Sequence, residues 1–149
     1  MKRLEIHKSE IQLEILGESG SKIIWFGLRE SNSWYAFEVQ VILDWAEVLT
    51  SIEVSEHNLA KLAYDLRKML GNQSSKLEFD VDYGRLSLIV ELEKRGNVFV
   101  KGIIGRNGLE TDELKFTFES HLSELDNFQS QIDKLLKQLG ISIDPRGFL

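Results

Sequence analysis

The 149-residue sequence has no cysteine and only one proline. Without cysteine there is no disulfide framework, no cysteine-ligated zinc and no thiol nucleophile. The longest apolar runs, such as residues 23–28, fall far short of the ~18 residues of a membrane-spanning helix. Two early cations at the N-terminus are not followed by an apolar segment, which argues against a signal peptide. These absences predict a cytoplasmic protein with no membrane partner.

Basic residues are also fewer than acidic ones. The sequence has 18 Lys and Arg and 24 Asp and Glu, which gives a net charge of -6 and a pI near 5.1. Binding to phosphates requires clustered Lys and Arg, so this balance predicts that nucleic acid is not a partner. The chain is 42% hydrophobic, with three Trp, three Tyr and eight Phe, which is too apolar for a disordered acidic protein. Its length fits a single domain over residues 1–149.

Alternating apolar and polar residues predict strands over much of the first half. These strands run over residues 11–15, 22–28, 34–43 and 48–54. The first two form an N-terminal pair within residues 1–30, joined by a turn at 17–20. The chain turns again near Asp44-Trp45, and a helix centred on Trp45 is the alternative over 43–54.

The second half shows a hairpin of residues 77–83 and 86–92, with Gly84-Arg85 as a two-residue type II′ loop. Strands over 98–104 and 114–118 follow, separated by a turn at Asn107-Gly108.

Two amphipathic helices interrupt the strands. Ser55 and Ser120 are the expected N-caps, and Gly71 and Gly140 are expected to follow directly after the C-terminal ends of the two helices. Each helix has one apolar stripe and must lie on an apolar surface. We therefore predict an α+β fold, a single antiparallel β-sheet of about six to eight strands with two amphipathic helices packed on one face. Residues 141–149 are expected to form a loose tail.

No arrangement of residues indicates catalysis. His7, His57 and His121 are far apart and match no metal-binding motif. The glycines at 102, 105 and 108 lie between two strands, whereas a dinucleotide-binding loop leads from a strand into a helix. We therefore expect no catalytic residues, no metal, no cofactor and no enzyme activity.

From residue 34 to 139, the order of elements and the apolar pattern follow one set of motifs. The matching segments are Trp34-Tyr35, 59–70, 77–92, the Val-x-Val-x-Gly strand at 98–102, the Leu-x-Phe-x-Phe strand at 114–118, and the closing helix with Leu122, Leu125, Phe128, Ile132 and Leu136. This pattern resembles the WapI-type immunity proteins of bacterial polymorphic toxin systems. Ser120-His121 stands where that family has Asp-Gln.

The resemblance implies a small cytosolic protein that binds a cognate toxin domain and neutralises it without catalysis. Nucleases are frequent among such toxins, and an acidic surface would complement their basic clefts. Alternating carboxylates on the polar side of the predicted sheet are the expected electrostatic contacts: Glu78, Asp80, Asp82, Glu91 and Glu93. Trp34 and Trp45 are candidate anchors for the partner.

Two alternatives remain open at this stage. A small-molecule-binding or regulatory module would require a buried apolar cavity between helices and sheet. Exposed strand edges would also allow a homodimer to form through a sheet edge.

Overall fold

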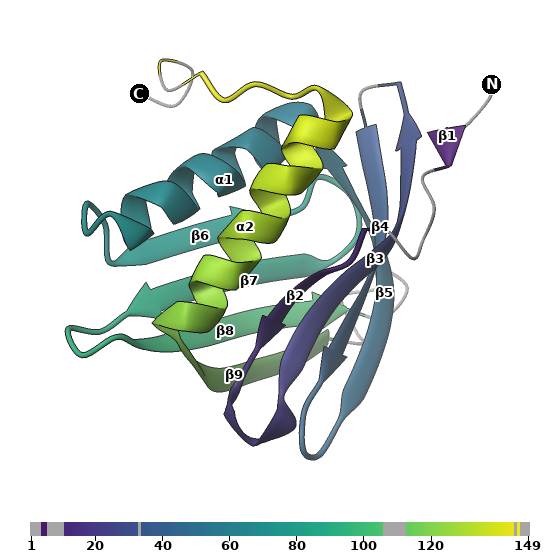
Figure 1. The fold of residues 1–149 in the computed structure, drawn as a ribbon. Coiled ribbons are helices and arrows are strands. Elements are labelled where there is room, and N and C mark those ends of the chain that lie inside the picture. Colours follow the sequence, from purple (N-terminus) through teal and green to yellow (C-terminus); the bar gives the residue numbers. More distant parts are fainter. Residues whose placement is uncertain (1–3, 6–10, 33, 106–112, 145, 147–149) are drawn as a thin grey trace.

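The computed structural model describes residues 4–5, 11–32, 34–105, 113–144 and 146, and in them the chain twice forms a run of strands followed by a helix (Figure 1). The strands are β1 (Leu4–Glu5), β2 (Leu13–Leu16), β3 (Lys22–Ser31), β4 (Trp34–Ile42), β5 (Glu47–Ser55), β6 (Lys76–Asp80), β7 (Leu86–Leu92), β8 (Asn97–Gly105) and β9 (Glu113–His121). The helices are α1 (Glu56–Leu70) and α2 (Leu122–Leu139), and a short 3-10 turn, η1 (Glu18–Gly20), joins β2 to β3.

The α+β class with two helices is confirmed, but the prediction of a single sheet is wrong. An N-terminal sheet has the order β1-β3-β4-β5, with β2 also paired to β3, and a separate C-terminal sheet has the order β6-β7-β8-β9. All strand pairs are antiparallel. Helix α1 separates the two runs of strands in the chain, so β6 begins a new sheet instead of extending the first along β5. The alternation of apolar and polar residues shows which face of a strand is buried, but it does not show which other strands pair with it.

Both helices begin directly where a strand ends. Ser55 caps α1 as predicted, and its hydroxyl accepts a hydrogen bond from the Asn58 backbone N–H at 3.2 Å. The predicted cap at Ser120 is wrong, because this residue is the buried penultimate residue of β9 and its hydroxyl donates to the Leu16 carbonyl oxygen. His121 precedes α2 without a side-chain capping bond.

One hydrophobic core joins both sheets and both helices. Trp25 of β3 lies at its centre and is 1% exposed. Its ring lies 5.7 Å from Phe37 of β4, 5.3 Å from Phe79 of β6 and 6.0 Å from Phe128 of α2, measured between centroids. Three layers that are far apart in sequence therefore meet at one side chain. Ile141, at the start of the predicted loose tail, is also buried.

The connection between β4 and β5 is a turn, as predicted, and the alternative helix centred on Trp45 is absent from these described residues. The predicted two-residue loop at Gly84-Arg85 is wrong, since β6 ends at Asp80 and residues 81–85 form a longer loop. The predicted turn at Asn107-Gly108 lies outside the described residues.

No helix in the described ranges is both long and apolar enough to cross a membrane.

Candidate partner-binding surface

Three large apolar side chains in the described part of the chain are exposed: Trp45 at 69%, Leu49 at 50% and Tyr83 at 58%. All three lie within β5 or beside one of its ends. Trp45 lies in the turn before this strand, Leu49 lies within it, and Tyr83 is bridged to Glu53 near its end. A residue of the loop between β6 and β7 thus lies beside a strand of the N-terminal sheet.

Backbone geometry explains the exposure of the first two. Leu43 donates to the Ala46 carbonyl at 2.8 Å, which closes the turn and leaves Trp45 at its tip. Leu49 pairs with Gln40 on β4, and its neighbours Val48 and Thr50 face inward. Because side chains alternate along a strand, Leu49 must then face outward.

The loop of residues 81–85 carries Tyr83 to the opposite end of β5. Glu53 donates its backbone N–H to the Tyr83 carbonyl at 2.9 Å, and Tyr83 returns a bond to the Glu53 carbonyl at 3.1 Å. The Tyr83 ring also packs on Trp34 of β4, with centroids 5.2 Å apart. Trp34 is therefore half-buried and supports Tyr83, whereas Trp45 projects freely enough to serve as an anchor.

Carboxylates accompany these apolar side chains. Residues 44–55 and 81–84 contain Asp44, Glu47, Glu53 and Asp82 but neither Lys nor Arg. Three of the four residues are exposed, and Glu53 is intermediate. We call the set formed by these four carboxylates with Trp45, Leu49 and Tyr83 the β5 ridge.

Two of the ridge carboxylates have local partners. Asp82 accepts hydrogen bonds from the Ser55 backbone N–H at 2.8 Å and from the Asn58 side chain at 2.9 Å. Glu47 accepts a hydrogen bond from the Gln40 side-chain amide. Asp82, one of the predicted contact residues, therefore also holds the 81–85 loop against the start of α1.

The other predicted contact carboxylates lie in or next to the C-terminal sheet. Glu78 and Asp80 alternate with buried residues on β6, Glu91 is on β7, and Glu93 follows the end of β7. The structure does not bring them together with Trp34 or Trp45, which belong to the N-terminal sheet and its β4–β5 turn.

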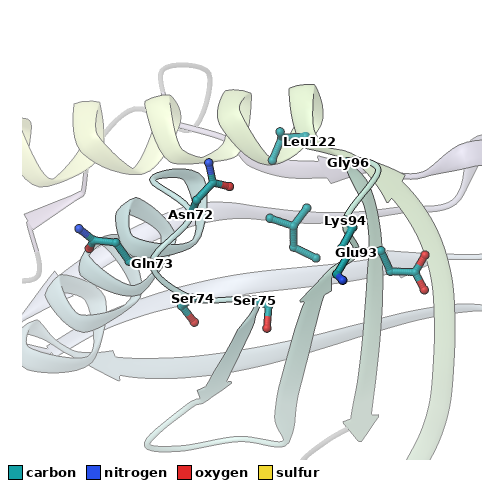
Figure 2. A pocket seen from close by; sticks show the side chains of 9 residues that line it. Asn72, Gln73, Ser74, Ser75, Glu93, Lys94, Gly96 and Leu122 are labelled. Atoms are coloured by element: carbon teal, nitrogen blue, oxygen red, sulfur yellow. The ribbon is translucent and has the colours of Figure 1, made fainter.

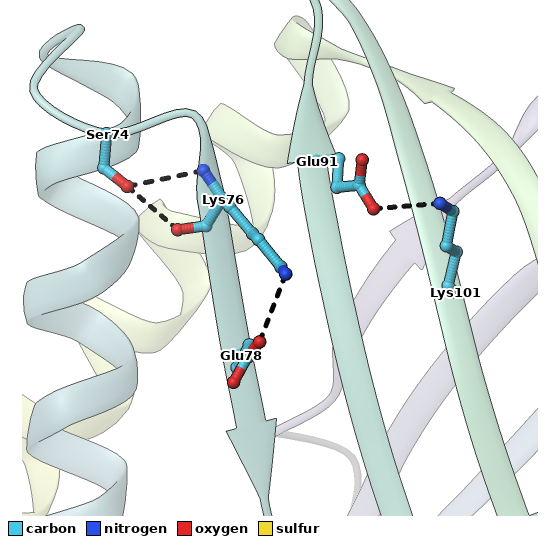
Figure 3. A network of polar contacts seen from close by, with 5 residues as sticks. All are labelled: Ser74, Lys76, Glu78, Glu91 and Lys101. Carbon is cyan, nitrogen blue, oxygen red and sulfur yellow. Dashed lines mark hydrogen bonds and ion pairs between the residues drawn. The ribbon is translucent and has the colours of Figure 1, made fainter.

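Lysines interleave with these carboxylates. The Lys76 ammonium lies 3.3 Å from the Glu78 carboxylate, and Lys101 of β8 donates to Glu91 at 2.9 Å. Figure 3 shows both contacts. The hydrogen bond and charge of Lys101 lower the pKa of Glu91 below its usual value. This face therefore carries mixed charge. The segments of the β5 ridge contain no Lys or Arg, although Arg29 of β3 pairs with Glu38 of β4, which accepts hydrogen bonds from Ser51 of β5.

A surface groove of about 490 Å³ lies at one end of the C-terminal sheet (Figure 2). Its lining residues are Asn72, Gln73, Ser74, Ser75, Leu92, Glu93, Lys94, Gly96 and Leu122. Most are polar, so the groove differs from the buried apolar cavity that would favour a small-molecule-binding module.

Within the described part of the chain, no group of three His, Asp or Glu side chains is placed to hold a metal ion. His57 is in the first turn of α1 and His121 precedes α2. Burial is the largest cause that raises the pKa of Tyr35, and the charges of Glu30 and Glu56 act in the same direction. Tyr35 is a core residue on β4 that pairs with Val54 of β5.

No protein-family model matches the chain, and no curated protein sequence is similar to it. Solved structures with a similar fold include the following two. Trypanosoma bruciei MRP1/MRP2 has a TM-score of 0.50 at 12% identity, covering 93% of this chain and 85% of that one. A guide-RNA-binding protein complex bound to a guide RNA has a TM-score of 0.53 at 10% identity, covering 88% of this chain and 94% of that one. At this level of identity the similarity shows a shared fold.

The second neighbour corrects one sequence-based prediction. Acidic composition led us to exclude nucleic acid as a partner, and that exclusion is wrong because this fold occurs in a protein complex bound to RNA. Net charge describes the whole chain, whereas binding depends on where the cations lie. Lys76, Lys101 and Lys115 all belong to strands of the C-terminal sheet.

Proposed function

We propose that this chain is a non-catalytic cytoplasmic protein that binds and neutralises a toxin domain, and that it makes contact through the β5 ridge. The exposure of Trp45, Leu49 and Tyr83 along one strand carries this proposal. Large apolar side chains exposed along one surface strand favour a protein interface, and Trp and Tyr are enriched among the residues that dominate binding energy. The resemblance of residues 34–139 to WapI-type immunity proteins indicates the class of partner.

A protein that neutralises a toxin by covering its active site must bind tightly but need not catalyse a reaction. A dissociation constant of 1 nM corresponds to about −12 kcal/mol. A few well-buried anchors can supply most of this energy when their conformations are fixed before binding. Tyr83 meets this condition, since its backbone is bonded to Glu53 and its ring packs on Trp34.

The test is a titration of the purified chain against a toxin domain encoded immediately upstream of it, together with co-expression in sensitive cells. We expect nanomolar binding and loss of toxicity. Trp45→Ala should weaken binding by about 30-fold, the effect of losing a ~2 kcal/mol anchor. Phe99→Ala is the matched control, because Phe99 is a partly exposed aromatic on β8, off the ridge. Failure to bind a folded, toxic domain contradicts the proposal.

RNA binding is the second candidate function, favoured by the fold shared with a guide-RNA-binding protein complex. The outward face of the C-terminal sheet offers suitable chemistry. Phe99 and Lys101 lie on β8, and Lys115 lies on β9 opposite Ile103. Aromatic side chains among cations are the combination on which single strands stack.

Fluorescence anisotropy with a labelled single-stranded RNA separates the two functions. If the chain binds RNA, affinity should fall steeply with salt, and Phe99→Ala and Lys101→Ala should each weaken it while Trp45→Ala does not. Absence of binding at 50 mM salt removes this candidate and leaves the toxin-neutralising function in place.

A further inference from the structure

The C-terminal sheet has a free edge at β6, since β7 lies on one side of this strand and no described strand lies on the other. Ser75 and Val81, which flank β6, bond through their backbones to β7 at 2.8 and 3.3 Å. In an antiparallel pair, every second residue bonds to the neighbouring strand. The even-numbered residues of β6 therefore point their backbone N–H and C=O groups away from β7: Lys76, Glu78 and Asp80.

Only the first of these three residues has a partner on this edge. The Ser74 hydroxyl donates to the Lys76 carbonyl at 2.8 Å and accepts from the Lys76 backbone N–H at 3.4 Å (Figure 3). The backbone groups of Glu78 and Asp80 have no such partner among the described residues. A strand edge with unpaired backbone groups is a template for a further strand. The edge of β6 thus offers the N–H and C=O groups of two residues to an added segment.

A groove of about 260 Å³ lies between this edge and α1. In Figures 1 and 3, α1 runs beside β6 on the side away from β7. The helix lines the groove with residues spaced three or four positions apart, which share one helical face: Asn58, Lys61, Leu62 and Asp65. The strand lines it with Glu78, Phe79 and Asp80. At ~30 Å³ per water molecule, the groove has room for about nine waters, which suits a short extended segment and not a second sheet.

The charges that line the groove favour a basic occupant. Three carboxylates line it, those of Asp65, Glu78 and Asp80, against one ammonium, that of Lys61. Lys61 pairs with Asp65 at 2.6 Å, so its charge is already balanced within the helix. Lys76 lies 3.3 Å from Glu78, but both side chains are more than half exposed, and such a surface pair contributes little. An incoming Lys or Arg can therefore replace Lys76 beside Glu78.

The two sides of β6 also specify which positions of the occupant are apolar. Leu62 and Phe79 line the groove and are 4% and 5% exposed, so they form an apolar floor. Glu78 and Asp80 are exposed on the other face of the strand. Side chains of an added strand alternate between these two faces. Every second residue would thus meet the apolar floor, and the residues between would meet the carboxylates.

We propose that the groove between β6 and α1 binds an extended segment of a partner protein in which basic and apolar residues alternate. The segment pairs antiparallel to β6, the more stable arrangement, and its basic residues lie opposite Glu78 and Asp80 and bond to their backbone groups. No residue of the β5 ridge lines this groove. The site is therefore separate from the proposed toxin-binding surface, and neither proposal depends on the other.

The test measures the fluorescence anisotropy of a labelled Lys-Val-Lys-Val-Lys peptide during titration with the full chain. We expect saturable binding of this peptide and none of Glu-Val-Glu-Val-Glu, which has the same apolar residues and the opposite charge. The lysine backbone amides face β6 in the proposed pairing, so their N-methylation should weaken binding by about 10-fold or more. The valine amides face away from β6, and their N-methylation should change the affinity by less than about twofold.

Two variants of Glu78 separate the backbone from the charge. Glu78→Pro removes the edge N–H, which proline permits on an edge strand, and should weaken binding by about 10-fold. Glu78→Gln keeps the N–H and removes only the charge, so it should weaken binding by about threefold. Glu119→Gln is the matched control, because Glu119 is an exposed glutamate on β9, at the other edge of the same sheet. Its affinity should stay within about 1.5-fold of the wild type.

Circular dichroism verifies that the variants fold. If Glu78→Pro does not fold, the methylated peptides still decide whether the β6 backbone is used. The proposal is overturned if the acidic and basic peptides bind equally, or if methylation of the lysine and valine amides has the same effect. Unchanged affinity in a folded Glu78→Pro variant also overturns it. Failure of the wild-type chain to bind the basic peptide at about 1 mM does so as well.

Discussion

Glu53 of β5 and Tyr83 of the β6–β7 loop exchange two backbone hydrogen bonds, of 2.9 and 3.1 Å, and so join the two sheets. Asp82 also donates its backbone N–H to the Glu53 carbonyl, at 3.0 Å. The loop therefore covers part of the β5 edge and places Tyr83 on the ridge.

Gly84 permits this close approach, and we expect Gly84→Ala to be strongly destabilising. Its φ is +93°, and an added Cβ would lie 2.5 Å from the Ser51 carbonyl oxygen. Gly20 is the matched control, since its φ is +80° with open space around it. Gly20→Ala should cost about 1–2 kcal/mol of unfolding free energy from backbone strain alone, and Gly84→Ala about 1–3 kcal/mol more. Urea unfolding measures the free energy of unfolding of both variants. Equal losses would show that the loop moves at little cost to make room for the added methyl group.

Truncation of Trp25 should lower the unfolding free energy strongly, whereas truncation of Trp45 should hardly change it. Trp25 is 1% exposed at the centre of the core, so Trp25→Ala should cost about 3–5 kcal/mol. Trp45 is 69% exposed, and Trp45→Ala should change stability by no more than about 0.5 kcal/mol. Acrylamide quenching provides a second measurement, because removing Trp45 should eliminate the most accessible fluorescence. A large stability loss in Trp45→Ala would indicate a structural side chain and would remove it as an anchor.

Local sequence signals predicted the elements well where short-range physics dominates. The alternation of β4, the turn at Asp44-Trp45 and the Ser55 cap each depend on neighbouring residues, and the structure agrees. Ser120 resembled a helix cap in the same local terms. It instead bonds to Leu16, 104 positions away, a contact that no local pattern contains.

The β5 ridge could be anticipated only in part. Leu49 falls between the inward positions Val48 and Thr50, so its exposure follows from the alternation alone. Tyr83 ends the predicted strand 77–83, where it continues the apolar alternation of Leu77, Phe79 and Val81, and this alternation predicts that it faces the core. Its exposure follows from the pairing of its backbone with Glu53, which depends on how the two sheets meet. The division into two sheets was unpredictable for the same reason.

Asp82 should contribute to stability through the loop that it holds. Its carboxylate accepts bonds from the Ser55 backbone N–H and the Asn58 side chain at the start of α1. Asp82→Ala should lower the unfolding free energy by about 1–2 kcal/mol. Glu78→Ala is the control, because Glu78 pairs only with exposed Lys76 among the described residues and should cost less than about 0.5 kcal/mol. Indistinguishable losses would mean that the loop is held by its backbone bonds alone.

Glu91 should titrate at lower pH than an ordinary glutamate, whose reference pKa is 4.5. The hydrogen bond from Lys101 favours the charged carboxylate, and the charges of Lys101 and Lys76 act in the same direction. Because the folded-state pKa is the lower one, the stabilisation is present above pH 4.5 and is lost as the pH falls through the folded value.

Carboxyl-carbon NMR shifts measured through a pH titration report the pKa of Glu91 directly. In Lys101→Ala, the pKa should rise towards 4.5, since its first cause is removed. Lys115→Ala is the control, because Lys115 is on β9 and does not contribute to the shift, so the pKa of Glu91 should stay low. A wild-type pKa at or above 4.5 would mean that water screens this surface pair and that Lys101 and Glu91 interact only weakly.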